Sequence, residues 1–181
     1  MISIQRKRLQ LVAIMLVFAA PVLIAFGLRL ADWQPSRTSN VGALVMPPQD
    51  VSDAPVTLAD GSRLDWKDSH WYFTLVVLAG SDCAEACFAR LDELLRMRVT
   101  LTQKAERLRI VYLGPPLPED RRAALRPILF GRDDAARFAA HVPATGEVAD
   151  VVVDPNGLLM LRHAPGIDAM GVRKDLARLI R

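Results

Sequence analysis

WYFTLVVLAGSDCAEACFARLDELL, residues 71–95, joins a continuous apolar run to a helical pattern that contains both cysteines of the chain. The apolar part, residues 71–80, is rich in β-branched and aromatic residues and ends in glycine, which predicts a strand buried on both faces. Beyond it, apolar residues recur at helical spacing through about Arg107, so Cys83 and Cys87 open a predicted helix. A buried strand that leads into such a helix favours an α/β fold.

Further strands and helices are predicted along the chain. Each is marked by a buried apolar run, by turn residues or by helical periodicity. The predicted elements are a hairpin around Asp60-Gly61, a second buried strand at residues 108–114, one or two short helices within residues 115–130 and 132–142, a hairpin of residues 148–153 and 158–164, and a last helix from about Asp168 to Ile180.

The order of these elements specifies a mixed sheet. Two buried strands joined by a helix need a right-handed crossover and therefore lie parallel, whereas the closing pair is joined by a short turn and is antiparallel. The predicted fold class is α/β, with a mixed central sheet flanked by helices. We expect the strand at residues 72–79 to be central and Cys83 to lie exposed just beyond its C-terminal end.

The distribution of charge excludes one broad class of function. The formal net charge is +3, and Arg6, Lys7 and Arg8 supply three of the 23 basic residues, which leaves the others balanced by 20 acidic residues. A nucleic-acid binder needs clustered basic charge to displace counterions, and no Lys/Arg stripe with interleaved aromatic residues occurs in the sequence. We therefore expect no nucleic-acid partner.

The N-terminal segment is typical of a membrane anchor. Residues 9–28 contain one polar residue, Gln10, and a helix of this length spans about 30 Å, the thickness of a bilayer's hydrocarbon core. Basic residues precede the segment and acidic ones first follow it at Asp32, so the positive-inside rule places the N-terminus in the cytoplasm. A cleaved signal peptide is the competing interpretation, although Arg29 stands where a cleavage site needs a small residue.

The anchored interpretation divides the chain into four parts. They are a cytoplasmic basic segment at residues 1–8, a transmembrane anchor at residues 9–28, a linker at residues 29–40 and an external domain at residues 41–181. The external compartment is oxidising, so two cysteines there can pair or be kept reduced by redox partners.

The spacing of Cys83 and Cys87 suits a disulfide. Residues i and i+4 share one helix face with their Cα atoms about 6 Å apart, within the range that a disulfide spans. Backbone N–H groups at the helix start favour a thiolate at Cys83, while the charges of Asp82 and Glu85 oppose it. Two thiolates on one helical turn also suit Cu(I). The alternative is a structural disulfide without chemistry, whose short loop would stabilise the fold only weakly.

The three histidines are interpreted first as surface or packing residues, because none has metal-ligand spacing to another. They are His70, His141 and His163. The sequence motifs of P-loop NTPases, of G-x-S-x-G hydrolases and of H-E-x-x-H metalloproteases do not occur. The cysteine pair is therefore the main candidate for chemistry.

A membrane anchor, a buried strand, CAEAC at a helix start, RIVYLG and the terminal VVVDPNGLLMLR with a closing helix together resemble the thioredoxin-like Sco/SenC proteins. NVGALVMPP and DPNGLLMLRHAPGIDAMGVRKDLARLI are also similar to a group of small membrane-anchored bacterial proteins usually encoded beside cytochrome oxidase genes. The resemblance implies a thioredoxin-like domain on the periplasmic side of a bacterial inner membrane. It also implies a role in cytochrome c oxidase assembly, by thiol–disulfide exchange or by Cu(I) handling at the copper site.

The site residues of the Sco/SenC family carry over in part. Cys83 and Cys87 match its two thiol ligands, and the implied partners are an oxidase subunit or assembly factor and a thiol reductant. Phe88 stands where the family has Pro, and residues 142–153 contain no His to match its third copper ligand. His141 is the nearest candidate, if the HVPATGE loop folds over the cysteines. Three functions stay open: a thiol–disulfide reductant, a copper chaperone and a non-redox assembly scaffold.

Overall fold

The computed structural model describes residues 2–31, 39–67 and 69–180. The chain forms two compact units, Met1–Ser39 and Asn40–Arg181. Most of the predicted linker, residues 32–38, lies outside the described residues. We describe the two units separately.

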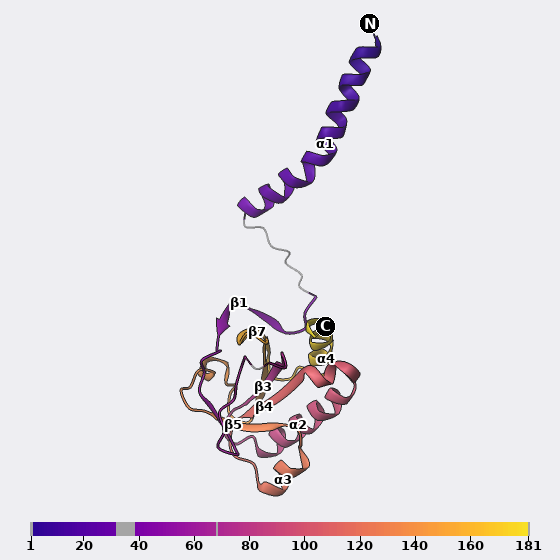
Figure 1. The fold of residues 1–181 in the computed structure, drawn as a ribbon. Helices are drawn as coiled ribbons and strands as arrows, with labels where there is room; N and C mark the ends of the chain where they lie inside the picture. The colour runs from indigo at the N-terminus through magenta and orange to yellow at the C-terminus, as the bar shows by residue number, and fades with distance from the viewer. Residues whose placement is uncertain (1, 32–38, 68, 181) are drawn as a thin grey trace. The chain divides into compact units, whose positions relative to one another are not determined.

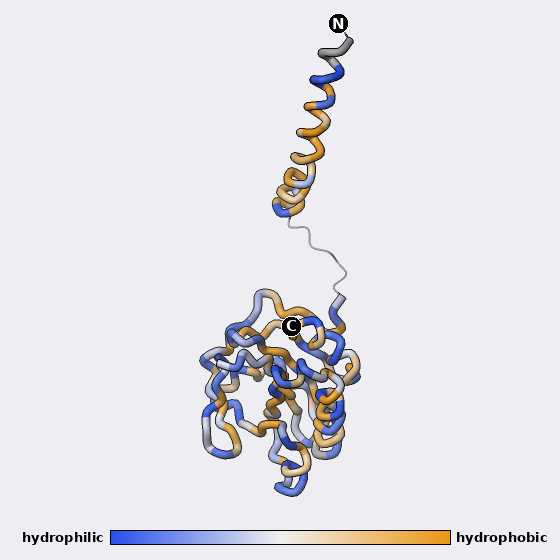
Figure 2. The backbone as a smooth tube through the Cα atoms, turned by 45° about the vertical axis from the view of Figure 1, so that its right-hand side comes forward, coloured by the Kyte–Doolittle hydropathy of each residue, from blue (hydrophilic) through white to orange (hydrophobic). Residues whose placement is uncertain are grey.

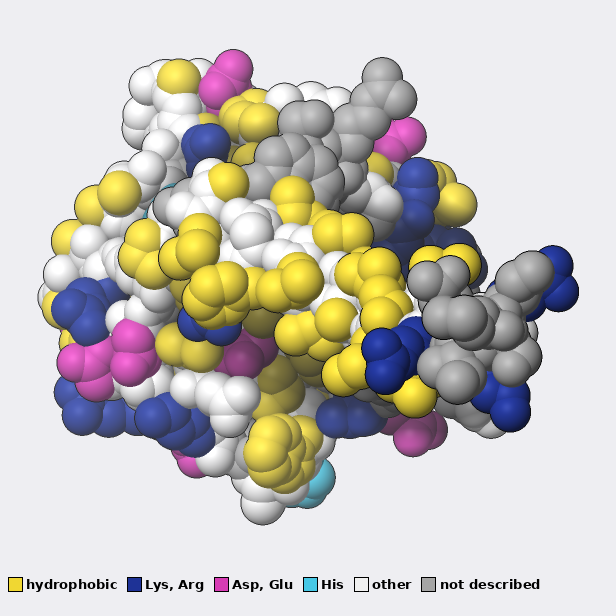
Figure 3. Space-filling model, turned by 90° about the horizontal axis from the view of Figure 1, so that it is seen from above, with side chains coloured by type: hydrophobic (Ala, Val, Ile, Leu, Met, Phe, Trp, Pro, Cys, Tyr) yellow, Lys and Arg dark blue, Asp and Glu magenta, His cyan; other side chains and the backbone are white. Residues whose placement is uncertain are grey.

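The first unit is a single long helix, α1 (Ile2–Leu30), which continues through Pro21. Its segment Arg6–Leu30 is long and apolar enough to cross a membrane, and none of its most apolar stretch is buried against protein. Figure 2 shows the hydrophobic colouring along most of its length, with hydrophilic residues near the N-terminal end. Figure 3 shows hydrophobic side chains in a band that ends beside Lys and Arg. By length and composition, this helix suits the predicted single membrane span.

The second unit is one seven-stranded mixed sheet with helices packed beside it (Figure 1). The strand order is β1-β7-β6-β3-β4-β5-β2. The strands are β1 (Ala43–Asp50), β2 (Val56–Leu58), β3 (Phe73–Ala79), β4 (Leu108–Leu113), β5 (Leu129–Asp133), β6 (Val148–Val153) and β7 (Leu158–His163). The helices are α2 (Ala84–Val99), α3 (Glu119–Ala124) and α4 (Ala169–Leu179), with 3₁₀ turns η1 (Thr102–Arg107) and η2 (Ala139–His141).

The structure confirms the predicted fold class and the central strand. Strand β3 lies in the middle of the sheet, parallel to β4 and antiparallel to β6. The predicted closing hairpin is present as the antiparallel pair β6–β7. Helix α4 follows, and the side chain of Asp168 caps it by accepting a hydrogen bond from the backbone N–H of Gly171.

Three local predictions differ from the structure in part. The helix predicted to run to Arg107 ends at Val99 and is followed by the 3₁₀ turn η1. Of the one or two short helices predicted within residues 115–130 and 132–142, α3 is present, whereas the second segment contains only the 3₁₀ turn η2. That segment begins inside β5, a strand whose apolar residues pair in parallel with β4. Around Gly61 the turn forms, but its second arm makes only an isolated bridge between Arg63 and Thr57. In the last two cases, pairing with distant strands outweighs the local pattern.

Two apolar layers enclose the sheet. Alternate residues of β3 point to opposite faces, as strand geometry requires. Leu75 and Val77 pack on the face covered by α2 and α4, together with both cysteines. Val76 and Leu78 pack on the other face, against Trp66 and other residues of the loops. Because β3 is buried on both faces, its sequence is one uninterrupted run of apolar residues.

Polar groups are also buried on the helical side of the sheet. Arg90 of α2 pairs with Asp150 of β6, and their side chains are 12% and 1% exposed. Burial raises the pKa of Asp150, an effect that the charge of Arg90 opposes. Asp175 of α4 accepts hydrogen bonds from the first backbone N–H groups of the domain, at Val41 and Gly42. The sequence pattern indicated neither of these buried carboxylates.

Candidate functional site

Strand β3 and helix α2 place the two cysteines. The strand ends at Ala79, a short turn follows, and Cys83 occupies the position just before the first helical residue. Cys87 lies one turn further on, with its Cα atom 5.4 Å from that of Cys83, and a disulfide joins the two. The expected pairing geometry at the helix start is therefore present.

The expected exposure of Cys83 was wrong. Its residue is 2% exposed, and Cys87 is fully buried. Cys87, Leu91 and Leu94 lie at helical spacing on the face of α2 that enters the core. A disulfide to Cys87 draws Cys83 onto this same buried stripe. An attack on Cys83 Sγ therefore requires local opening of the turn that leads from β3 into α2.

The residues beside the two cysteines in the chain reach the surface. Ser81, Asp82, Glu85 and Ala86, which flank the cysteines in the chain, are all exposed. Helix termini are the parts of a fold that open with least free energy. The buried disulfide therefore lies at an element end whose neighbours in the chain reach solvent.

Tyr112 of β4 reaches the disulfide from the neighbouring strand. Its hydroxyl lies 3.3 Å from Cys87 Sγ and 2.9 Å from the carbonyl oxygen of Pro115, within hydrogen-bond distance of both. Burial raises the pKa of Tyr112 to about 12. The hydroxyl thus keeps its proton at neutral pH and acts as a donor beside the sulfur atom.

Helix α3 contributes a cation beside the first turn of α2. Arg121 donates to Glu85 at 2.6 Å, and its guanidinium lies 4.8 Å from the centre of the Phe88 ring. The hydrogen bond from Arg121 lowers the pKa of Glu85. The negative charge of Glu85, which was expected to disfavour a thiolate at Cys83, is therefore partly neutralised by Arg121.

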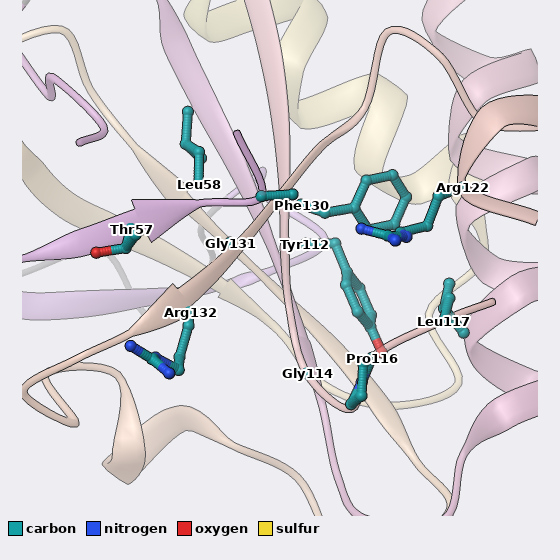
Figure 4. Close-up of a pocket in the computed structure, with 11 residues that line it drawn as sticks. Thr57, Leu58, Tyr112, Gly114, Pro116, Leu117, Arg122, Phe130, Gly131 and Arg132 are labelled. Carbon is teal, nitrogen blue, oxygen red and sulfur yellow. The ribbon is translucent and has the colours of Figure 1, made fainter. Parts of the chain in front are cut away.

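A cavity of about 400 Å³ opens next to Tyr112 (Figure 4). Its walls are largely apolar and come from β2, β4, β5 and the segment that follows β4. Leu58, Leu117 and Phe130 are among the lining residues, with Arg122 and Arg132 as charged members. Tyr112 thus lines this cavity and also contacts Cys87.

The segment 143–147 packs against the turn that precedes Cys83. The backbone N–H of Gly80 donates to the carbonyl of Glu147 at 3.0 Å, and that of Gly146 donates to the carbonyl of Ser81 at 2.7 Å. A Cβ atom on Gly80 would lie 2.0 Å from the carbonyl oxygen of Ala144. The close approach of these two backbones explains why glycine ends the apolar run.

Gly80→Ala is expected to destabilise the domain by about 1–3 kcal/mol, because the clash is with backbone atoms that cannot turn aside. Urea denaturation of the full chain measures this change. Gly61→Ala gives the cost of backbone strain without a clash, since a Cβ atom there meets nothing within 4 Å and only the positive φ of 85° is strained. Wild-type stability of Gly80→Ala would show that the two segments do not pack as described.

The structure does not bring His141 to the cysteines. Its Nε2 atom lies 3.0 Å from Oε1 of Gln49, and partial burial lowers the pKa of the imidazole. His163 is buried and bonds to Asp175, while the ring of His70 stacks on Tyr72. Within residues 2–31, 39–67 and 69–180, no three His, Cys, Asp or Glu residues are grouped so as to hold a metal ion.

Comparison with protein families gives one match. The model of the transmembrane-like, thioredoxin-like, C-terminal domain matches residues 71–181, which is more than half of the chain. The chain belongs to this family. The matched residues of the transmembrane-like, thioredoxin-like family contain β3, both cysteines and the closing hairpin, while α1 precedes them. No curated protein sequence is significantly similar to the chain.

The solved structures that are similar to this protein have thioredoxin-like folds. Apo Sco1 from Thermus thermophilus matches with 17% identity and a TM-score of 0.54, over 80% of this chain and 99% of its own. Copper-bound yeast Sco1 matches with 14% identity and a TM-score of 0.54, over 80% and 94%. The bacterioferritin comigratory protein of Xanthomonas campestris, described by its alkyl peroxide reduction activity, matches with 10% identity and a TM-score of 0.53, over 76% and 95%. Identities this low establish the fold alone.

Proposed function

We propose that this protein is a membrane-anchored thiol–disulfide exchange protein that works through Cys83 and Cys87. The observation that carries the proposal is the disulfide at the start of α2, directly after the central strand of a thioredoxin-like sheet. Ligand and reaction sites of open α/β sheets lie at this end of the strands. A disulfide that closes so short a loop adds little stability, which favours chemistry over reinforcement.

The reaction is a pair of thiol–disulfide exchanges. A thiolate of an external dithiol reductant forms a bond with Cys83 Sγ, the Cys83–Cys87 bond breaks, and its electron pair goes to Cys87 Sγ. The second thiol of the reductant then displaces Cys83 and leaves as a disulfide. In the reduced protein, Cys83 attacks a client disulfide and Cys87 resolves the mixed disulfide. We infer that the turn before α2 opens around Cys83 for each attack, and the exposure of Ser81 and Asp82 supports this step.

The proposed client is the copper site of cytochrome c oxidase, whose cysteines must be reduced before they bind copper. The similarity in fold to Sco1, one structure of which contains copper, supports this direction of the proposal. The proposed setting is a bacterial inner membrane, with α1 as a single anchor and residues 41–181 on the periplasmic side. The apolar segment and its preceding basic residues support that orientation.

Two other functions are each supported by one observation. The cysteine pair in its dithiol form offers two soft ligands for Cu(I), which supports copper handling. The burial of both sulfur atoms supports a non-redox scaffold that binds an assembly partner. We rank exchange above copper handling because His141 bonds to Gln49 and the described residues provide no third ligand at the cysteines.

A copper titration separates these functions. Reduced full-length protein is titrated with Cu(I) in the presence of a competing chelator, as wild type, Cys87→Ser and His141→Ala. We expect weak, exchangeable binding that Cys87→Ser removes and His141→Ala leaves unchanged, because two thiolates leave a coordination position open. Tight binding that His141→Ala loosens would favour the chaperone over the exchange protein.

A further inference from the structure

The hydroxyl of Tyr112 has one proton and two acceptors. Pro115 offers a carbonyl oxygen at 2.9 Å, and Cys87 offers its sulfur at 3.3 Å. In the disulfide state the sulfur is neutral and a weak acceptor, so the carbonyl takes the proton. After the disulfide breaks, Cys87 Sγ is an anion, and an ionised acceptor forms a hydrogen bond about twice as strong as a neutral one.

We propose that Tyr112 is a catalytic residue of disulfide reduction, which stabilises Cys87 as the leaving thiolate by turning its O–H from Pro115 to Cys87 Sγ. This inference rests on the proposed function. The tyrosine keeps its proton throughout: the reductant's sulfur bonds to Cys83 Sγ, the disulfide bond breaks, and its electron pair remains on Cys87. The raised pKa of the phenol agrees with a group that donates a hydrogen bond without ionising.

Burial makes this donor necessary. Cys87 is fully buried, so water does not solvate the anion that forms there, and burial alone disfavours a thiolate. The charged group nearest in sequence is Glu85 on the same helix, which disfavours the anion further but is paired with Arg121 of α3. Tyr112 of β4 is the side chain that the described structure places within hydrogen-bond distance of Cys87 Sγ.

The same contact assigns the two sulfur atoms to different roles. A thiol of lower pKa leaves faster, and the tyrosine lies against Cys87. Attack is therefore directed to Cys83, which follows the exposed turn residues Ser81 and Asp82. The geometry thus selects Cys83 as the sulfur that forms mixed disulfides.

Tyr112→Phe tests this role, because it retains the ring that packs 5.7 Å from Phe130 and removes only the hydroxyl. Tyr72→Phe is the matched control. Tyr72 is the other tyrosine of the chain, and it lies before β3, whereas the cysteines lie after that strand. The full-length variants are reduced by dithiothreitol, and their rates and equilibrium potentials are measured. Thermal unfolding shows whether each variant is folded.

We expect Tyr112→Phe to slow reduction about tenfold and to leave the equilibrium potential near that of wild type, because the hydrogen bond stabilises the thiolate that forms during the exchange and not the protonated thiol of the reduced protein. Tyr72→Phe behaves as wild type. An unchanged rate of reduction in Tyr112→Phe would overturn the inference, even if its thermal stability falls. A wild-type disulfide that no dithiol reduces would overturn the proposed function as well.

Discussion

Cys87→Ser is expected to abolish catalytic turnover of disulfide exchange and to accumulate a mixed disulfide with the client. The variant retains Cys83, which attacks the client, but lacks the thiol that resolves the product. Cys83→Ser is expected to abolish turnover without accumulating this species, because Cys87 lies one turn further into α2, against Tyr112, and not beside the exposed turn. Non-reducing gel electrophoresis of alkylated extracts distinguishes the two outcomes.

The loss of turnover in these variants would not result from unfolding. Removal of a disulfide that closes so short a loop costs about 2 kcal/mol or less by loop entropy, below the usual stability of a domain. Circular dichroism of both variants provides the control. Full turnover by either serine variant, or equal trapping by both, would contradict the assigned roles.

Arg90→Leu is expected to destabilise the domain by about 3–5 kcal/mol at neutral pH. The substitution leaves Asp150, which is 1% exposed, without its ion-pair partner. One oxygen of this carboxylate already lacks a hydrogen-bond partner within the described residues. Arg96→Leu on the same helix is the control, since Arg96 pairs with Asp92 at the surface and its loss costs about 0.5 kcal/mol or less.

The pH dependence of Arg90→Leu identifies the cause. Burial raises the pKa of Asp150 above its ordinary 3.8, and the substitution removes the charge that opposes this rise. The folded state then holds a proton that the unfolded state releases, so stability falls as pH rises above that value. We expect the deficit to shrink on acidification toward pH 3.8, as measured by urea denaturation. A deficit independent of pH would assign the effect to lost packing instead.

Local sequence signals were sufficient for the central part of the fold. The uninterrupted apolar run of β3, the Asp154–Gly157 turn and the periodicity of α4 each reflect interactions within a few residues. Their arrangement followed from the handedness of the crossover between β3 and β4. Strand β5 was missed because its strand character depends on pairing with β4, a contact that a local pattern does not report.

The cysteine site was located from the sequence, but its environment was not. The spacing of Cys83 and Cys87 was sufficient to expect a disulfide at a helix start. Tyr112 is 25 residues from Cys87 in the chain and reaches it only because β4 lies beside β3. One feature of the sequence could have predicted the burial of Cys83. Cys83 lies four residues before Cys87, which in turn lies four residues before Leu91, so all three fall on the buried side of α2.

The redox state of Cys83 and Cys87 in living cells tests the proposed exchange most directly. Cells that express the full chain are quenched with acid, free thiols are alkylated with a reagent that adds mass, and the protein is detected on a non-reducing gel. An exchange protein is expected to give both dithiol and disulfide bands, with the dithiol band lost when the supply of external reductant is removed. A single disulfide band that never changes, under either condition, would contradict exchange and favour the non-redox scaffold.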